Sequence, residues 1–102
     1  MEEIVLGIII HAGNAKSKLY EALKASKEND FEKANQLIKE ADDELLNAHK
    51  IQTKLIQNEA AGEKSEISIL LIHSQDHLMT CMSEKNLITE IIELRKELKN
   101  KN

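Results

Sequence analysis

The stretch HSQDHLMT, residues 73–80, lies in the middle of the segment that decides the fold. From about residue 66 to residue 100, apolar side chains recur every three or four positions, which is the pattern of a helix. This helix has two apolar faces, and one of them is expected to pack against the rest of the chain. The residues of this core face are Ile67, Leu70, Leu71, Leu78, Cys81, Met82, Ile88 and Ile92.

A second line of residues follows the opposite side of the same helix. We call this line the seam, and it consists of Ile69, His73, Asp76, Thr80, Leu87, Ile91, Leu94 and Leu98. Its steps of four and three residues, resumed after a step of seven, are typical of the contact line of a coiled coil. Left exposed, its last four residues would form an apolar patch of the kind that monomers avoid. The seam therefore predicts self-association through this helix.

Two amphipathic helices are expected before it, over about residues 3–27 and 31–60. Gly7 and Gly13 interrupt the first, and such glycines are expected where a neighbouring helix approaches closely. The buried stripe of the first helix is predicted to be Ile4, Ile8, Ala12, Ala15, Leu19, Ala22 and Ser26. The stripe of the second is predicted to be Ala34, Leu37 or Ile38, Ala41, Leu45, Ala48, Gln52, and Leu55 or Ile56.

Short connections separate the three segments. Asn29 suits a left-handed residue at the end of the first helix, and Asp30 is a good N-cap for the second. Gly62 is the expected C-cap of the second helix, and Ser65 is the expected N-cap of the third. The sequence therefore predicts an all-α fold, an antiparallel up-down-up bundle of three helices.

Composition supports one small helical domain over residues 1–102. The chain has no proline and only two aromatic residues, Tyr20 and Phe31, so its core must consist of aliphatic side chains. This composition favours helices over strands. A chain of this length is close to the commonest domain size.

The net charge and the cysteine content limit which partners the protein can bind and in which cellular compartment it is expected. The net charge of −4 argues against nucleic acid as a partner, since binding phosphates needs a basic patch. The only basic cluster, residues 95–101, is explained by the negative end of its own helix. The single cysteine, Cys81, excludes an intrachain disulfide, and the apolar run at residues 4–10 is too short to cross a membrane. We expect a cytoplasmic protein.

Asp76 lies on the seam, where copies of it would meet in an oligomer. Buried carboxylates that face one another repel, and burying even one charge is costly. Three arrangements are open: a hard cation such as Mg²⁺ lies among the carboxylates, the carboxylates share protons, or the middle of the seam is hydrated.

The four histidines have different expected roles. His11 is expected to be a packing or surface residue, and His49 to have a hydrogen-bonded structural role. His73 and His77 are four residues apart, so their rings can meet on one side of the helix. This spacing is compatible with metal binding, with acid–base catalysis, or with a nucleophilic imidazole that carries a phosphoryl group. Gln75 lies about 160° around the helix from His73, so any contact between them must cross a subunit boundary.

The segment from His73 to Thr80 resembles the His-x-Gln-Asp-His-Leu-Met segment of the lactose/cellobiose-type enzyme IIA proteins of the phosphoenolpyruvate-dependent sugar phosphotransferase system. The resemblance extends over nearly the whole chain. Residues 12–17, AGNAKS, are similar to the signature of that family's first helix, and residues 29–31, NDF, stand where the family usually has Gly-Asp-Phe. Ala48-His49, Gln52-Thr53 and Glu59-Ala60-x-Gly62 also correspond.

This resemblance implies a homotrimer with the third helices packed about its axis. It implies that His73 accepts a phosphoryl group from phospho-HPr and passes it to a cysteine of the IIB component, with Gln75 and His77 in supporting roles. It also implies that Asp76 binds one divalent cation, Mg²⁺ by the ligand argument above, shared by the trimer. The sugar contacts the membrane component IIC and is not bound directly.

Three stretches are more similar to the cellobiose/chitobiose branch of the family than to the lactose branch. They are Asn14-Ala15-Lys16, residues 37–41 and Gln57-Asn58-Glu59. Two other classes of function stay open at this point: a non-catalytic helical adaptor whose seam binds partner helices, and a bundle that binds a metal through His and Asp.

Overall fold

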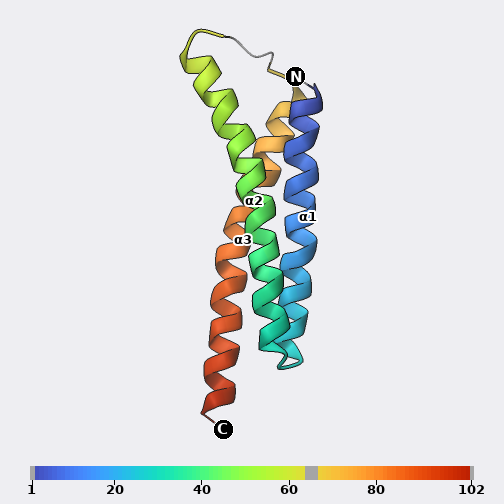
Figure 1. Ribbon diagram of the computed structural model, residues 1–102, viewed down its shortest axis with the longest axis vertical. Helices are drawn as coiled ribbons and strands as arrows, with labels where there is room; N and C mark the ends of the chain where they lie inside the picture. Colours follow the sequence, from blue (N-terminus) through green and yellow to red (C-terminus); the bar gives the residue numbers. More distant parts are fainter. Residues whose placement is uncertain (1, 64–66, 102) are drawn as a thin grey trace.

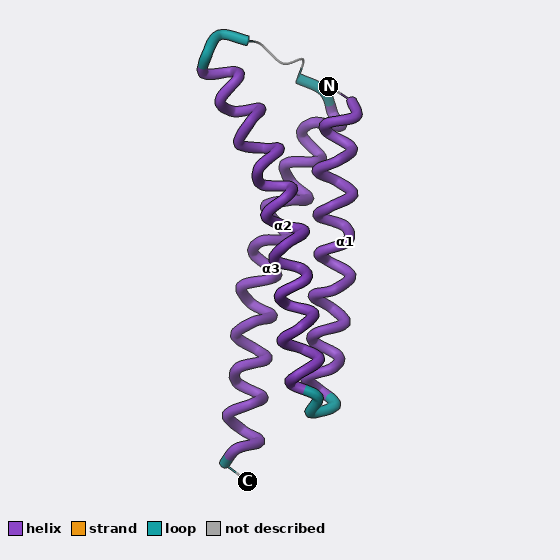
Figure 2. Tube along the Cα trace, in the orientation of Figure 1, coloured by secondary structure: helices purple, strands orange, loops and turns teal. Residues whose placement is uncertain are grey.

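The chain reverses direction twice to form a bundle of three helices in the computed structural model, which describes residues 2–63 and 67–101. Helix α1 spans Glu2–Lys27, α2 spans Phe31–Ala60 and α3 spans Ile69–Asn100. The helices run down, up and down in Figure 1, and no strand occurs in the described part of the chain (Figure 2). The prediction of an all-α, antiparallel up-down-up bundle is confirmed.

The turn between α1 and α2 is built from local hydrogen bonds. Asn29 has a left-handed backbone with φ of 64°. The Asp30 N–H donates to the Ala25 carbonyl at 2.9 Å, and the Asn29 N–H donates to the Ser26 carbonyl at 3.1 Å, which together form a Schellman motif. The Asp30 side chain then accepts from the Lys33 N–H at 3.2 Å and caps α2. Both predictions for this turn are confirmed.

Asn29→Gly is expected to stabilise the protein by roughly 0.5–1 kcal/mol, because glycine adopts a left-handed backbone without the Cβ clash that asparagine retains. For a domain of this size, a change of 1 kcal/mol shifts the melting temperature by about 4–8 °C. Thermal unfolding followed by circular dichroism measures the shift. Asn47→Gly, in the exposed interior of α2, is the control and should destabilise by about 1 kcal/mol. Equal destabilisation by both changes would contradict the prediction.

The second connection differs from prediction at its far end. Gly62 has φ of 94°, and a second Schellman pair, Gly62 N–H to Glu59 and Glu63 N–H to Asn58, ends α2 as expected. The predicted N-cap, Ser65, lies outside the described residues. Ser68 caps α3 instead, because its Oγ accepts from the Leu71 N–H at 3.1 Å. Helix α3 therefore begins at Ile69 rather than near residue 66.

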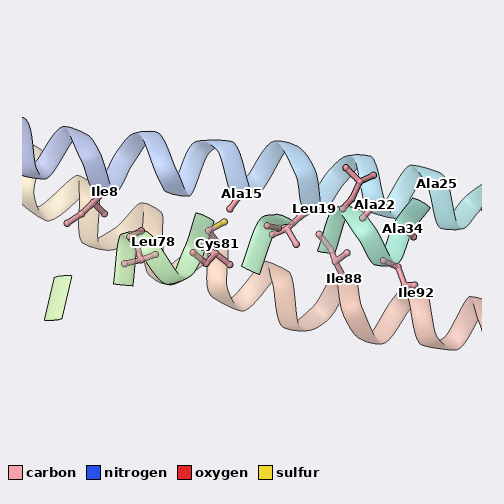
Figure 3. Close-up of a cluster of buried hydrophobic side chains, with 14 of the residues drawn as sticks. Ile8, Ala15, Leu19, Ala22, Ala25, Ala34, Leu78, Cys81, Ile88 and Ile92 are labelled. Carbon is pink, nitrogen blue, oxygen red and sulfur yellow. The ribbon is translucent and has the colours of Figure 1, made fainter. Parts of the chain in front are cut away.

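The core lies along α1, which packs against both other helices, while α2 and α3 contact each other over a shorter length. Figure 3 shows apolar side chains of α3 pointing into this core from below α1. Nearly all the predicted stripe residues are buried. The buried apolar residues are Val5, Ile8, Ala12, Ala15, Leu19, Ala22, Ala25, Ala34, Leu37, Ala41, Leu45, Ala48, Leu55, Leu78, Cys81, Ile88 and Ile92.

Two predicted core positions are wrong, and one predicted alternative is settled. Ile4 is exposed and Val5 takes its place, because Val5 lies three residues before Ile8 on the buried face. Ile67 is exposed because α3 begins after it. Of the two alternatives near the end of α2, Leu55 is buried and Ile56 is exposed, and this end of α2 leans away from the other helices (Figure 1).

Arg95 has a role that the charge pattern did not reveal. Its Nη1 donates to the Leu23 carbonyl and to the Ser26 Oγ, both at 2.9 Å. The guanidinium of α3 therefore binds the last turn of α1, where free carbonyls carry partial negative charge. The interpretation that the basic cluster serves only the end of its own helix is corrected for this residue.

Candidate functional site

His73 and His77 form a pair of parallel rings on one side of α3. Their ring planes differ by 2° and their centroids are 5.9 Å apart. His77 is half-buried, and its Nε2 lies 3.8 Å from the place where a Cβ on Gly13 of α1 would lie. His73 is exposed. The pair thus consists of one imidazole held against α1 and one that is open to an incoming molecule.

Gly13 and Gly7 both face side chains of neighbouring helices. A Cβ on Gly7 would lie 3.5 Å from the Ile51 Cδ1, and the corresponding distance for Gly13 is to His77. These are ordinary van der Waals distances, so the predicted close approach involves side chains rather than backbones. Gly13 leaves the surface beside the His77 ring open.

Residues next to the two histidines in the sequence anchor this part of α3. Ser74 and Leu78 are fully buried, and the Ser74 Oγ donates to the Leu71 carbonyl at 2.7 Å. The Thr80 Oγ1 donates to the Asp76 carbonyl at 2.8 Å. Because the backbone is fixed from the core side, the orientation of the exposed His73 is determined by a rigid helix rather than by a loop.

Gln75 lies on the other flank of α3, away from His73. Its Oε1 accepts a hydrogen bond from the Nε2 of Gln52, a side chain of α2 that is 8% exposed. Helical spacing predicts Gln52 in the buried stripe but predicts no function for it. The signal was present, since an amide in an apolar stripe requires a hydrogen-bonding partner.

Asp76 is exposed on the seam of the single chain. Among the described residues, no group of three His, Cys, Asp or Glu side chains within one chain could hold a metal ion. A carboxylate is nevertheless the kind of hard oxygen ligand that Mg²⁺ prefers, and Asp76 is exposed with respect to the described part of the chain. The donor set fits a divalent cation only where copies of Asp76 come together.

The seam is exposed along its length, as the prediction of an uncovered apolar face requires. Ile69 is 88% exposed, Leu87 63%, Ile91 39%, and Leu94 and Leu98 are each 56% exposed. No part of the described chain covers these side chains. The chain therefore presents a long apolar strip that continues directly from His73 and Asp76.

The other two histidines differ from expectation. His11 is bound through Nδ1 to the Glu44 Oε2 at 2.6 Å, an ion pair or hydrogen bond between α1 and α2 rather than simple packing. The partner lies 33 residues away, so helical spacing did not reveal it. His49 is exposed, and it makes no side-chain hydrogen bond to the described residues, so its predicted hydrogen-bonded role is wrong.

Cys81 is unsuited to nucleophilic chemistry. Its thiol is buried in the core and lies 3.5 Å from the Ala12 carbonyl. Burial raises the pKa of Cys81, and the nearby Glu84 carboxylate acts in the same direction. Since the thiolate is the reactive form, a buried thiol with a raised pKa is inert at neutral pH. Of these two potential nucleophiles, the exposed His73 is the accessible one.

The three-helix fold and the exposed imidazole fit the class of small helical carrier proteins. The sequence model of the family described as "PTS system, Lactose/Cellobiose specific IIA subunit" matches residues 3–96. The chain therefore belongs to the lactose/cellobiose-specific IIA family of the phosphotransferase system. Its activity is that of a phosphoryl carrier within that system.

Curated relatives cover nearly the whole chain. It is 48% identical over 98 residues to the lichenan-specific phosphotransferase enzyme IIA component of Bacillus subtilis, covering 96% of this chain and 89% of the relative. It is 46% identical to the N,N'-diacetylchitobiose-specific component of Escherichia coli, covering 97% and 85%. It is 51% identical to the lactose-specific component of Staphylococcus epidermidis, covering 88% and 86%. These similar values do not separate the branches, so the cellobiose/chitobiose preference stays a prediction.

Solved structures agree with the fold. The crystal structure of the cellobiose-specific enzyme IIA from Bacillus anthracis superposes with a TM-score of 0.94 at 44% identity, covering 98% of this chain and 92% of that one. The IIA(chitobiose)–HPr complex from the N,N'-diacetylchitobiose branch of Escherichia coli gives 0.84 at 46% identity, covering 96% and 95%. None of the described helices is long and apolar enough to pass through a membrane.

Proposed function

We propose that His73 is the residue that carries the phosphoryl group, received from phospho-HPr and passed to a cysteine of a IIB component. The observation that carries the proposal is the exposed His73 ring, stacked against a His77 ring that is held by α1. An uncharged imidazole nitrogen is a competent nucleophile near pH 7, and a neighbouring ring can fix its tautomer and orientation.

The proposed phosphoryl transfer takes place in two displacement steps, which need no oxidant and no net gain or loss of a proton. A ring nitrogen of His73 attacks phosphorus, the new N–P bond forms, and the electron pair of the broken bond returns to the donor. In the second step a thiolate of IIB attacks the same phosphorus, and the electron pair of the N–P bond returns to His73. His77 orients the ring in both steps, and Gln75 is placed to assist from a neighbouring subunit.

HPr is supported as a partner by the similarity to an IIA(chitobiose) protein whose complex with HPr has been solved. The IIB component, and IIC through the same complex, follow from family membership. The transported sugar is a β-linked disaccharide, and the cellobiose/chitobiose type is preferred to lactose on the residues quoted above. The protein is a carrier that binds no sugar, and a cytoplasmic location suits a chain with one buried, reduced cysteine.

We infer a homotrimer assembled through the seam of α3. Covering the exposed leucine and isoleucine side chains of the seam removes apolar surface from water, which favours association. In such an assembly the copies of Asp76 converge near the axis. They would hold one divalent cation, Mg²⁺ by ligand preference, and when bound this ion would offset the repulsion among the carboxylates.

Asp76→Leu is expected to leave the assembly intact or to stabilise it by roughly 1–4 kcal/mol, because apolar packing replaces a cluster of buried charges. Thermal unfolding with and without EDTA measures the change. The parent should lose stability when the cation is removed, and the Asp76→Leu protein should not. Asp43→Leu, at an exposed position of α2, is the matched control. Dissociation of the Asp76→Leu protein would contradict the arrangement.

The test of the proposed function is incubation with phosphoenolpyruvate, enzyme I and HPr. The parent protein should take up one acid-labile phosphoryl group per chain, and the label should map to the peptide that contains His73. No phosphate uptake, together with partner binding through the seam, would favour the adaptor alternative. Tight transition-metal binding that is lost in His77→Ala would favour the metal-binding bundle.

A further inference from the structure

One polar side chain interrupts the buried face of α2. Every other buried residue of this helix is an alanine or a leucine, whereas Gln52 is an amide that is 8% exposed. Burying an amide without a hydrogen bond costs free energy, so its partner matters. That partner is Gln75 of α3, whose Oε1 accepts from the Gln52 Nε2. The pair joins α2 to α3, two helices that contact each other less than either contacts α1.

This hydrogen bond determines which end of the Gln75 amide faces outward. A glutamine amide has an oxygen that accepts and an NH₂ group that only donates. With its oxygen engaged by Gln52, Gln75 has its NH₂ group free to donate to another acceptor. A freely rotating amide would offer either end. In this pairing, Gln52 leaves Gln75 with a donor as its free end.

The direction of this donor is set by the geometry of α3. His73 lies on the seam, and Gln75, two residues later, lies about 160° from it around the helix axis and therefore beside the seam rather than on it. His77, on the His73 flank, lies against α1, while Gln75 lies against α2. When copies pack around the seam, the α2 flank of one subunit faces the α1 flank of the next. The Gln75 donor of one subunit is then directed at His73 of its neighbour.

We propose that Gln52 is a positioning residue for phosphoryl transfer, holding the Gln75 amide so that its NH₂ group donates to the phosphoryl oxygens on His73 of the adjacent subunit. This inference rests on the proposed function of His73 and on the proposed assembly. The phosphoryl group brings negatively charged oxygens to the seam, where the Asp76 carboxylates of the proposed assembly also lie. A preoriented neutral donor stabilises that charge without adding a proton-transfer step.

The central experiment measures the rate of phosphoryl transfer from phospho-HPr in a double-mutant cycle. Gln52→Met keeps the length of the side chain and removes the hydrogen bond, and it is expected to slow transfer about tenfold, the value of one oriented hydrogen bond to a charged group. Gln75→Met should have a similar effect. The double variant should be no slower than Gln75→Met alone, because Gln52 acts only through Gln75.

Controls separate positioning from stability. Gln36→Met changes the same residue type at an exposed position of α2 and should transfer at the parental rate. Melting temperature and sedimentation are recorded for every variant, since a purely structural Gln52 would lower stability and leave transfer in the assembled protein unchanged. Gln52→Glu offers an acceptor only, so it turns the Gln75 amide around and should also slow transfer.

A measurement on the unaltered protein does not depend on any variant folding. The side-chain NH₂ resonances of Gln75 should shift when His73 is phosphorylated, whereas those of Gln36 should not. Parental transfer rates in assembled Gln52→Met, additive effects in the cycle, or an unmoved Gln75 amide signal would each overturn the inference. If the parent itself takes up no phosphate at His73, the proposed function fails instead, and the two failures are thereby distinguished.

Discussion

His73→Ala is expected to reduce phosphoryl uptake from phospho-HPr to below about one-thousandth of the parental rate, because it removes the atom that forms the covalent bond. Folding should be unaffected, since the His73 side chain is exposed and stacks on the His77 ring. Acid-labile phosphate per chain and the transfer rate to IIB are the two measurements. The free energy of unfolding, followed by thermal unfolding, should stay within about 1 kcal/mol of the parental value.

Two further histidine variants make this test selective. His49→Ala is the matched control, an exposed histidine on α2, and should be phosphorylated like the parent. His77→Ala should retain phosphorylation but slow it about tenfold, since the ring beside His73 orients it and is not consumed. Normal phosphorylation of His73→Ala would refute the assignment of the residue. Loss of labelling in His77→Ala with full labelling in His73→Ala would reverse the two roles.

Features fixed by local interactions were predictable from the sequence. The left-handed Asn29, the Asp30 cap and the end of α2 at Gly62 each depend on residues within one turn, so short motifs identify them. The start of α3 was missed by three residues because Ser65 and Ser68 both precede the apolar run. The choice of Ser68 depends on its bond to the Leu71 N–H, which sequence spacing does not distinguish.

For polar contacts between helices, the sequence could indicate that a buried side chain needs a hydrogen-bonding partner, but not which residue that partner is. Gln52, in an apolar stripe, had to find a hydrogen bond, but its pairing with Gln75 depends on how far α3 is shifted along α2. The pair of His11 with Glu44 depends likewise on the rotation of α1 against α2. The candidate site was clearer, because His73 and His77 belong to one helix and their spacing alone brings the rings together.

The seam was also predictable, because a second apolar line on one helix can be recognised from residue spacing without knowing how the helices pack against one another. Helices α1 and α2 bury one face of α3, and the leucine and isoleucine side chains of the seam stay exposed in the described chain. The homotrimer that we propose would cover them. The site and the seam share the same helix face, so loss of assembly should also remove the neighbour's Gln75 from His73.

Leu87→Lys with Ile91→Lys is therefore expected to convert the assembled protein into single chains at micromolar concentration. Each leucine or isoleucine buried in an interface contributes about 1.5–3 kcal/mol, so two positions in each of three copies amount to on the order of 10 kcal/mol. Three pairs of lysines brought together at an axis add repulsion. Sedimentation measures the change in mass, and circular dichroism should show that the helices persist.

Leu46→Lys with Ile56→Lys provides the matched control, because these side chains of α2 are 51% and 59% exposed, similar to the 63% of Leu87. The control protein should remain assembled and should be phosphorylated normally. The dissociated Leu87→Lys, Ile91→Lys protein should keep its His73 and His77 pair but transfer phosphate about tenfold more slowly, because Gln75 of the neighbour is absent. An assembled Leu87→Lys, Ile91→Lys protein would show that the seam is not the interface. Dissociated chains that transfer at the parental rate would show that the site is complete within one subunit.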